Sequence, residues 1–159
     1  MNDLVLPNGL GIAVAGLARE AGRALVETGG FILRPYDTAC ASTLAVAGAA
    51  GITRRRGLFA ITPLALGELF EFADEHELTV TAQWHSHRFE AFLSRTDLAH
   101  GFDVPGFHTA VVPYFEVASA DPADWGWWQY GEQGWTESIA PQSVEGDVSL
   151  VTFDEDGVS

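Results

Sequence analysis

Apolar side chains recur every three or four residues in two stretches of the chain, which is the spacing of one face of an α-helix. The first stretch predicts a helix over residues 11–26 and the second a helix over residues 63–77. The apolar positions are Ile12, Leu17, Ala21 and Leu25 in the first stretch and Leu66, Leu69, Phe70 and Ala73 in the second. The second helix has a clear start, because Thr62 is a good N-cap residue and the first helical position tolerates Pro63.

Segments rich in β-branched and aromatic residues surround these helices and predict strands. The expected strands cover residues 3–6, 31–33, 43–47, 57–61, 78–87, 109–112 and 125–130. We expect a turn at residues 7–9 and a short helix at residues 94–100. Because strands and helices are interleaved, the pattern predicts one α/β or α+β domain.

The end of the chain differs in composition from the rest. Residues 137–159 carry six acids and no base, so we divide the chain into a domain over residues 1–136 and an acidic C-terminal segment over residues 137–159. Residues 148–153 are expected to pair as an edge strand, and the end at residues 154–156 is expected to be frayed.

Charge and composition exclude several classes of protein. The 159 residues carry a net charge of −14, which repels nucleic acid and anionic membranes. The longest apolar runs fall short of the ~18 residues that a membrane span needs. The first residues lack the basic segment of a signal peptide, so we expect a cytoplasmic protein.

Two histidines stand at the end of the strand expected over residues 78–87. Side chains alternate between the faces of a strand, so His85 and His87 project from the same face. Two neighbouring imidazoles suit one divalent metal ion, although a pair of surface histidines at a strand end has the same spacing.

Ser94 and Asp97 follow in a Ser-x-x-Asp arrangement. The spacing is close to that of a capping box, in which the serine and the acid bond each other's backbone N–H groups. A capped first turn also aims a carboxylate rigidly, so Asp97 is a candidate third ligand. Two histidines and one carboxylate leave the fourth zinc position for water, which is the arrangement of a catalytic zinc site.

With Glu27 upstream in Glu-Thr-Gly-Gly, this pattern resembles the signature of the JAMM (MPN-plus) metalloproteases. The resemblance covers residues 4–130 and implies a single MPN-like domain, with a mixed sheet flanked by two main helices and a short helix after the metal motif. It implies one Zn²⁺ per chain, with His85, His87 and Asp97 as its ligands. It further implies that Glu27 is the general acid/base and that Ser94 donates a hydrogen bond to the developing oxyanion.

The chain departs from this signature in the loop after the second histidine. Arg88 stands where the family usually has a proline, and nine residues rather than ten separate His87 from Asp97. The missing residue falls before Ser94, so the Ser-x-x-Asp turn itself is intact.

The resemblance implies a zinc-dependent isopeptidase or peptidase that cleaves after the C-terminal tail of a ubiquitin-like protein, in deconjugation or precursor processing. The compact chain resembles prokaryotic members of the family. Two other functions stay open: a non-catalytic MPN-type scaffold that binds a partner protein, and a zinc hydrolase of a small amide such as a carrier-linked amino acid. An open groove beside an unpaired strand edge would favour tail cleavage, and a closed pocket would favour the small amide.

Two further features have plainer interpretations. Residues 54–56 are three consecutive arginines, expected in a solvated loop or, alternatively, as a dock for an acidic partner segment. His108 adjoins an expected strand and is expected to be a packed histidine rather than a ligand.

Overall fold

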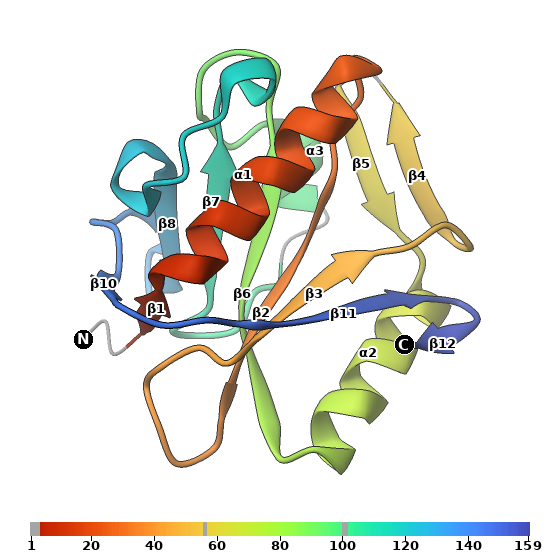
Figure 1. The fold of residues 1–159 in the computed structure, drawn as a ribbon, viewed down its shortest axis with the longest axis vertical. Coiled ribbons are helices and arrows are strands. Elements are labelled where there is room, and N and C mark those ends of the chain that lie inside the picture. The colour runs from red at the N-terminus through yellow and green to blue at the C-terminus, as the bar shows by residue number, and fades with distance from the viewer. Residues whose placement is uncertain (1–3, 56, 100–101) are drawn as a thin grey trace.

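A mixed sheet of eight strands forms the centre of the protein (Figure 1). The structure is a computed structural model that describes residues 4–55, 57–99 and 102–159. Its strands are β1 (Val5–Pro7), β2 (Gly29–Pro35), β3 (Thr43–Ala47), β4 (Ile52–Arg55), β5 (Leu58–Ile61), β6 (Leu78–Ser86), β7 (His108–Val112), β8 (Gly126–Gly131), β9 (Gly134–Glu137), β10 (Gln142–Val144), β11 (Ser149–Asp154) and β12 (Gly157–Val158). The helices are α1 (Asn8–Arg23), α2 (Pro63–Glu75) and α3 (Arg95–Ala99), with 3₁₀ turns η1 (Phe115–Val117) and η2 (Pro122–Asp124).

The central sheet has the strand order β12-β11-β3-β2-β6-β7-β8-β9. Strand β6 lies in its middle, antiparallel to β2 and parallel to β7. Two smaller pairs, β1 with β10 and β4 with β5, complete the fold, and the β4–β5 hairpin stands beside the central sheet at the upper right of Figure 1. Each of the expected strands has a counterpart in the structure, and β4, β9, β10 and β12 are additional.

The two main helices bury opposite faces of the sheet. Adjacent residues of β2 point to opposite sides, so Ile32 packs in the core that holds Leu10 of α1, while Phe31 packs in the core that holds Leu69 and Ala73 of α2. This arrangement confirms the expected α+β architecture, a mixed sheet flanked by two main helices and a short third helix.

Helix α2 follows its local sequence signals closely. It begins at Pro63, and the hydroxyl of Thr62 accepts a hydrogen bond from the backbone N–H of Ala65 at 3.3 Å. The Thr62–Pro63 pair therefore caps this helix as expected. The helix ends at Glu75, two residues before the expected end, and Glu77 adopts a left-handed conformation with φ of 55°.

Helix α1 begins earlier than expected, so the expected turn at residues 7–9 is wrong. Asn8 and Gly9 are helical, because both bond a distant segment: the Asn8 side-chain oxygen accepts from the N–H of Gly146, and the Gly9 N–H donates to the carbonyl of Gly146. A Cβ on Gly9 would stand 2.9 Å from that same carbonyl oxygen, so the close approach requires glycine. Because Gly146 lies far along the chain from Asn8 and Gly9, the sequence around residues 7–9 gives no sign of these hydrogen bonds.

The C-terminal segment is part of the sheet: the strand expected over residues 148–153 is present as β11, whereas the end expected to be frayed forms an ordered turn to β12. Strand β11 pairs in parallel with β3 and buries Phe153, and β12 then covers its outer side at Phe153 and Asp154. The turn between β11 and β12 is anchored as well: Asp154 accepts from the N–H of Ala49, and Glu155 accepts from the hydroxyl of Thr62 at 2.6 Å. The acids that indicated fraying therefore serve as hydrogen-bond acceptors.

Candidate metal centre

The two histidines of the candidate site come from the end of β6. His85 is the next-to-last residue of the strand and His87 follows directly after it, and both are buried. The backbone holds His87 in place, because its N–H donates to Val112 and its carbonyl accepts from Phe115. The two rings lie with their centroids 5.0 Å apart, on the same side of the strand, as the spacing predicts.

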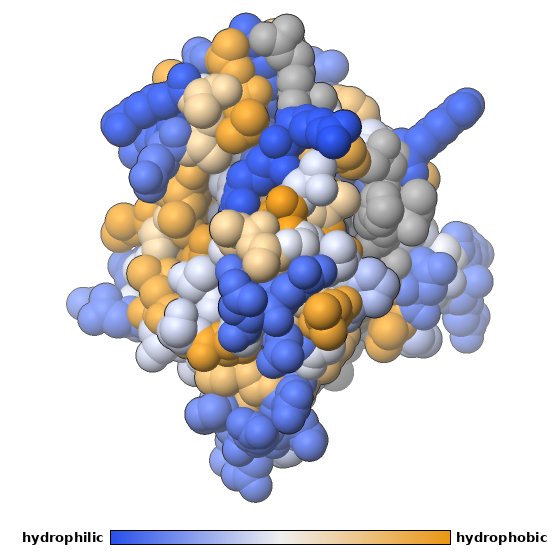
Figure 2. All heavy atoms as spheres, turned by 90° about the vertical axis from the view of Figure 1, so that its right-hand side faces the viewer, coloured by the Kyte–Doolittle hydropathy of each residue, from blue (hydrophilic) through white to orange (hydrophobic). Residues whose placement is uncertain are grey.

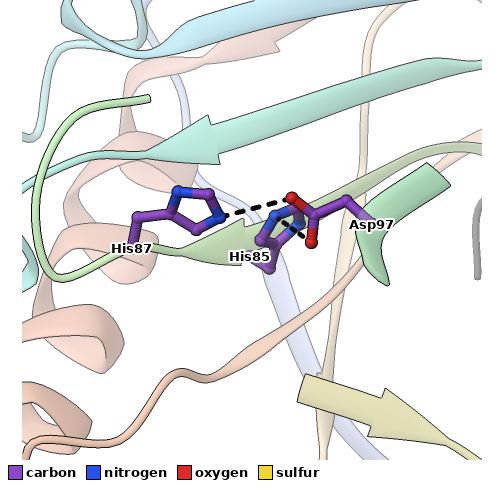
Figure 3. A group of neighbouring side chains, drawn as sticks. All are labelled: His85, His87 and Asp97. Carbon is purple, nitrogen blue, oxygen red and sulfur yellow. Dashed lines mark ion pairs between the residues drawn. The ribbon is translucent and has the colours of Figure 1, made fainter. Parts of the chain in front are cut away.

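Asp97 reaches this pair from the first turn of α3. Ser94 and Asp97 form the expected capping box: the Ser94 N–H donates to the Asp97 carboxylate at 2.8 Å, and the Asp97 N–H donates to the Ser94 hydroxyl at 3.0 Å. The carboxylate then lies 3.1 Å from Nε2 of His85 and 3.4 Å from Nε2 of His87. Figure 3 shows the three side chains pointing toward one another from β6 and α3.

The three side chains fit a divalent metal ion. One ligand atom from each lies within 4.8 Å of the others. Nε2 of His85 is buried and, among the residues that the structure describes, makes no hydrogen bond; its contact with the Asp97 carboxylate at 3.1 Å is an ion-pair distance only. A buried nitrogen without a hydrogen bond is costly, and a metal ion would satisfy it. The second nitrogen of His87, Nδ1, lies 3.2 Å from the Glu90 carbonyl, the outer contact that directs a metal-ligating Nε2.

The charges in this cluster depend on one another. Burial alone would raise the pKa of Asp97, but the imidazoles of His85 and His87 outweigh it and hold that pKa well below its usual range. Burial alone would lower the pKa of His87, but the hydrogen bond and charge of Asp97 raise it above its ordinary value. At neutral pH the carboxylate is ionised, as an oxygen ligand must be.

Glu27 lies beside the cluster, after the end of α1 and just before β2. It is 8 % exposed, and this burial raises the pKa of its carboxyl group, while the nearby His87 and His85 act in the opposite direction. The Gly29 and Gly30 that follow allow the chain to pass close to its neighbours. A Cβ on Gly29 would stand 2.4 Å from the Trp84 carbonyl oxygen, and one on Gly30 would stand 2.0 Å from that of Ala45.

The residue between the two histidines fixes the segment that carries Glu27. The hydroxyl of Ser86, fully buried, accepts from the N–H of Thr28 at 2.9 Å and donates to the carbonyl of Thr28 at 3.3 Å. The backbone N–H of Ser86 donates to the same carbonyl at 2.9 Å. Glu27 is therefore held against the strand that presents His85 and His87 by three hydrogen bonds to its neighbour.

Arg54 extends this network to the hairpin, so the expectation of a solvated loop is wrong for this residue. Its guanidinium donates to the Thr28 hydroxyl at 3.2 Å, to the Gly48 carbonyl at 2.6 Å and to the Ala47 carbonyl. Arg55 is exposed, and Arg56 lies outside the described residues. The spacing of the sequence motif gave no sign of the Ser86–Thr28–Arg54 network.

A cleft of about 260 Å³ opens next to the metal cluster. Glu27, His87 and Ser94 line it together with Gly57 from the turn of the β4–β5 hairpin. Figure 2 views the molecule from the side of the hairpin, where the upper half of the face is hollowed and hydrophilic and hydrophobic residues meet around the hollow. The structure thus brings all five candidate residues into one region: His85, His87, Asp97, Glu27 and Ser94.

His108 does not join this site. Its side chain is buried against Trp127, with ring centroids 6.4 Å apart, and burial lowers its pKa to about 4. The expectation that His108 is a packed histidine is confirmed.

Comparison with known proteins identifies the fold. The chain matches no protein-family model and no curated protein sequence. A protein from Desulfitobacterium hafniense, DSY2949, matches at a TM-score of 0.64 with 14 % identity, over 92 % of this chain and 94 % of that one. AF2198, a JAB1/MPN domain protein from Archaeoglobus fulgidus, matches at a TM-score of 0.50 with 18 % identity, over 89 % of this chain and all of that one.

The likeness to AF2198 indicates a JAB1/MPN-like fold. The expected single MPN-like domain is confirmed at this level, and the His85–His87–Asp97 cluster adds a site that could bind a metal ion. None of the described helices is long and apolar enough to cross a membrane.

Proposed function

We propose that the protein is a zinc-dependent isopeptidase or peptidase of the JAMM type, acting in the cytoplasm on the C-terminal tail of a ubiquitin-like protein. The observation that carries this proposal is the convergence of His85, His87 and Asp97 beside a buried Glu27. Two imidazoles and one carboxylate form a three-ligand set that suits one zinc ion with an open position. When bound, zinc lowers the pKa of a coordinated water and polarises the scissile carbonyl.

Glu27 has the properties of a group that moves protons. Burial raises the pKa of its carboxyl group above the ordinary value, which is the direction of shift that a general acid/base needs. In the proposed reaction its carboxylate takes the proton of the attacking water and returns it to the leaving amine. Ser86 and Thr28 hold the backbone next to Glu27, so this residue stays beside the strand that carries His85 and His87.

Ser94 is placed to assist at the carbonyl oxygen. Its hydroxyl oxygen already accepts the Asp97 N–H, which leaves the hydroxyl hydrogen available for donation. Because Ser94 lines the same cleft as Glu27, this hydrogen bond can reach an oxyanion formed there.

The hairpin supports a tail as substrate rather than a small amide. Strands β4 and β5 pair only with each other among the described residues, so each has a free edge. Their turn contributes Gly57 to the cleft. An extended peptide can add to a free strand edge, which brings its end to the cleft.

The test compares the wild type with Glu27→Gln on a ubiquitin-like protein whose terminal carboxyl is joined to a fluorogenic amine. The zinc-loaded wild type should release the amine, and Glu27→Gln should retain zinc but lose at least ~10²-fold in rate. Equal rates for the two proteins would remove Glu27 from the mechanism. No release by the zinc-loaded wild type, across a panel of ubiquitin-like proteins, would overturn the proposed substrate.

A further inference from the structure

Two phenylalanine side chains stand exposed at the mouth of the cleft. Phe89 is 60 % exposed and Phe92 is 49 % exposed, although both line the cleft next to the metal cluster. Removing a large aromatic side chain from water is favourable, so two of them exposed on the lining of one polar cleft indicate a surface that a ligand covers. Both lie in the loop where the chain departs from the JAMM signature.

The loop holds these rings in place. The Phe89 carbonyl accepts from the N–H of Tyr114, and the Glu90 carbonyl bonds Nδ1 of His87. Ala91 packs against Gly126, where an added Cβ would stand 2.8 Å from the Ala91 methyl group. The two rings are therefore exposed on a loop whose backbone is fixed by hydrogen bonds and packing.

Each ring also has a defined orientation. The Phe92 ring stands edge-on to the His87 ring, with centroids 4.9 Å apart. The Arg88 guanidinium lies over the Phe89 ring, 5.2 Å from its centroid. An arginine on one ring and a histidine against the other limit their movement, so the pair presents preformed apolar walls directly beside the metal ligands.

We propose that Phe89 and Phe92 are specificity-determining residues that select an apolar or aromatic group next to the scissile amide of the substrate. The assignment rests on the proposed function, because it places the reacting amide at the His85–His87–Asp97 cluster. The cleft volume of about 260 Å³ accommodates a group of the size of a phenyl ring. A charged group in the same position would lose hydration against the Phe92 ring, so it would bind less well than an apolar group.

The test measures the binding of two metal-chelating probes to zinc-loaded protein by isothermal titration calorimetry. Acetohydroxamate presents a methyl group beside its chelating atoms, and phenylacetohydroxamate presents a benzyl group. The wild type should bind the benzyl probe about tenfold more tightly, because the ring is buried against Phe89 and Phe92. Phe92→Ala and Phe89→Ala should each reduce this preference at least ~3-fold while still binding acetohydroxamate.

Phe70→Ala is the matched control, because Phe70 is a half-exposed phenylalanine on α2 outside the cleft. This variant should prefer the benzyl probe as strongly as the wild type does. Equal affinity of the wild type for the two probes would overturn the specificity assignment and leave the metal site standing. A preference that survives in Phe89→Ala and Phe92→Ala would do the same. Failure of the wild type to load zinc would instead overturn the proposed function, and this inference with it.

Discussion

Replacing Ser86 with alanine should destabilise the protein well beyond the loss of one hydroxyl group. The Ser86 side chain is fully buried, and its oxygen is the acceptor for the N–H of Thr28 at 2.9 Å. In Ser86→Ala this N–H stays buried, because Thr28 is 4 % exposed, and it loses its partner. Leaving one buried donor unsatisfied costs about 1–3 kcal/mol. The hydroxyl's own donation to the Thr28 carbonyl matters less, since the Ser86 N–H already bonds that carbonyl.

We therefore expect the free energy of unfolding to fall by about 2 kcal/mol, which for a chain of this length lowers Tm by about 4–8 °C. Urea unfolding followed by circular dichroism measures the change in metal-free protein, so that zinc binding does not contribute. Ser143→Ala is the control, because Ser143 lies exposed on β10 and should change stability by less than ~0.5 kcal/mol. If Ser86→Ala lowered the free energy of unfolding as little as Ser143→Ala does, the idea that Ser86 anchors the segment next to Glu27 would be refuted.

Two further predictions concern groups away from the metal ligands. The folded-state pKa of His108, about 4, lies below the ordinary 6.5, so between these values the unfolded chain binds a proton that the folded chain does not. The contribution of neutral His108 to the free energy of unfolding is complete above about pH 6.5 and falls by about 2 kcal/mol by pH 5. Urea unfolding at pH 7.5 and pH 5 should therefore show a smaller loss of stability in His108→Gln than in the wild type. An equal loss of stability in the two proteins would contradict this. Arg54→Met should speed amide hydrogen exchange in β4 and β5 at least ~10-fold, because it removes three hydrogen bonds that hold the hairpin. Replacing the exposed Arg55 with methionine is the control and should leave the exchange rates unchanged. Equal exchange rates in the two variants would show that Arg54 does not hold the hairpin.

The parts of the fold that could be predicted are those that local sequence decides. Helix α2 has its N-cap, its proline and its apolar stripe within one stretch, so its start was predictable to the residue. The start of α1 was not, because Asn8 and Gly9 bond Gly146. The strand over residues 148–153 was predicted, but its partner β3 was not, because parallel partners far apart in the chain share no local turn. The ordered end after this strand was not predicted either, since its acidic composition pointed toward solvent.

The candidate site divides in the same way. Alternation on a strand places His85 and His87 together, and the capping box delivers Asp97, so these positions follow from spacing. The support around them does not, because Ser86 and Arg54 act through segments that only the tertiary fold brings together. An arginine in a basic run resembles a solvated residue until the carbonyls at the end of β3 are seen to accept from it.

The central claim is a zinc ion bound by His85, His87 and Asp97, and the metal content of the purified protein tests it most directly. Elemental analysis after incubation with zinc and removal of free metal should give about one zinc per chain for the wild type. The His87→Ala, Asp97→Ala double variant should retain little or none while its circular dichroism spectrum stays that of a folded protein. His108→Gln, which removes a buried histidine outside the cluster, should keep the full amount. Undiminished zinc in the double variant, or none in the wild type, would contradict the account.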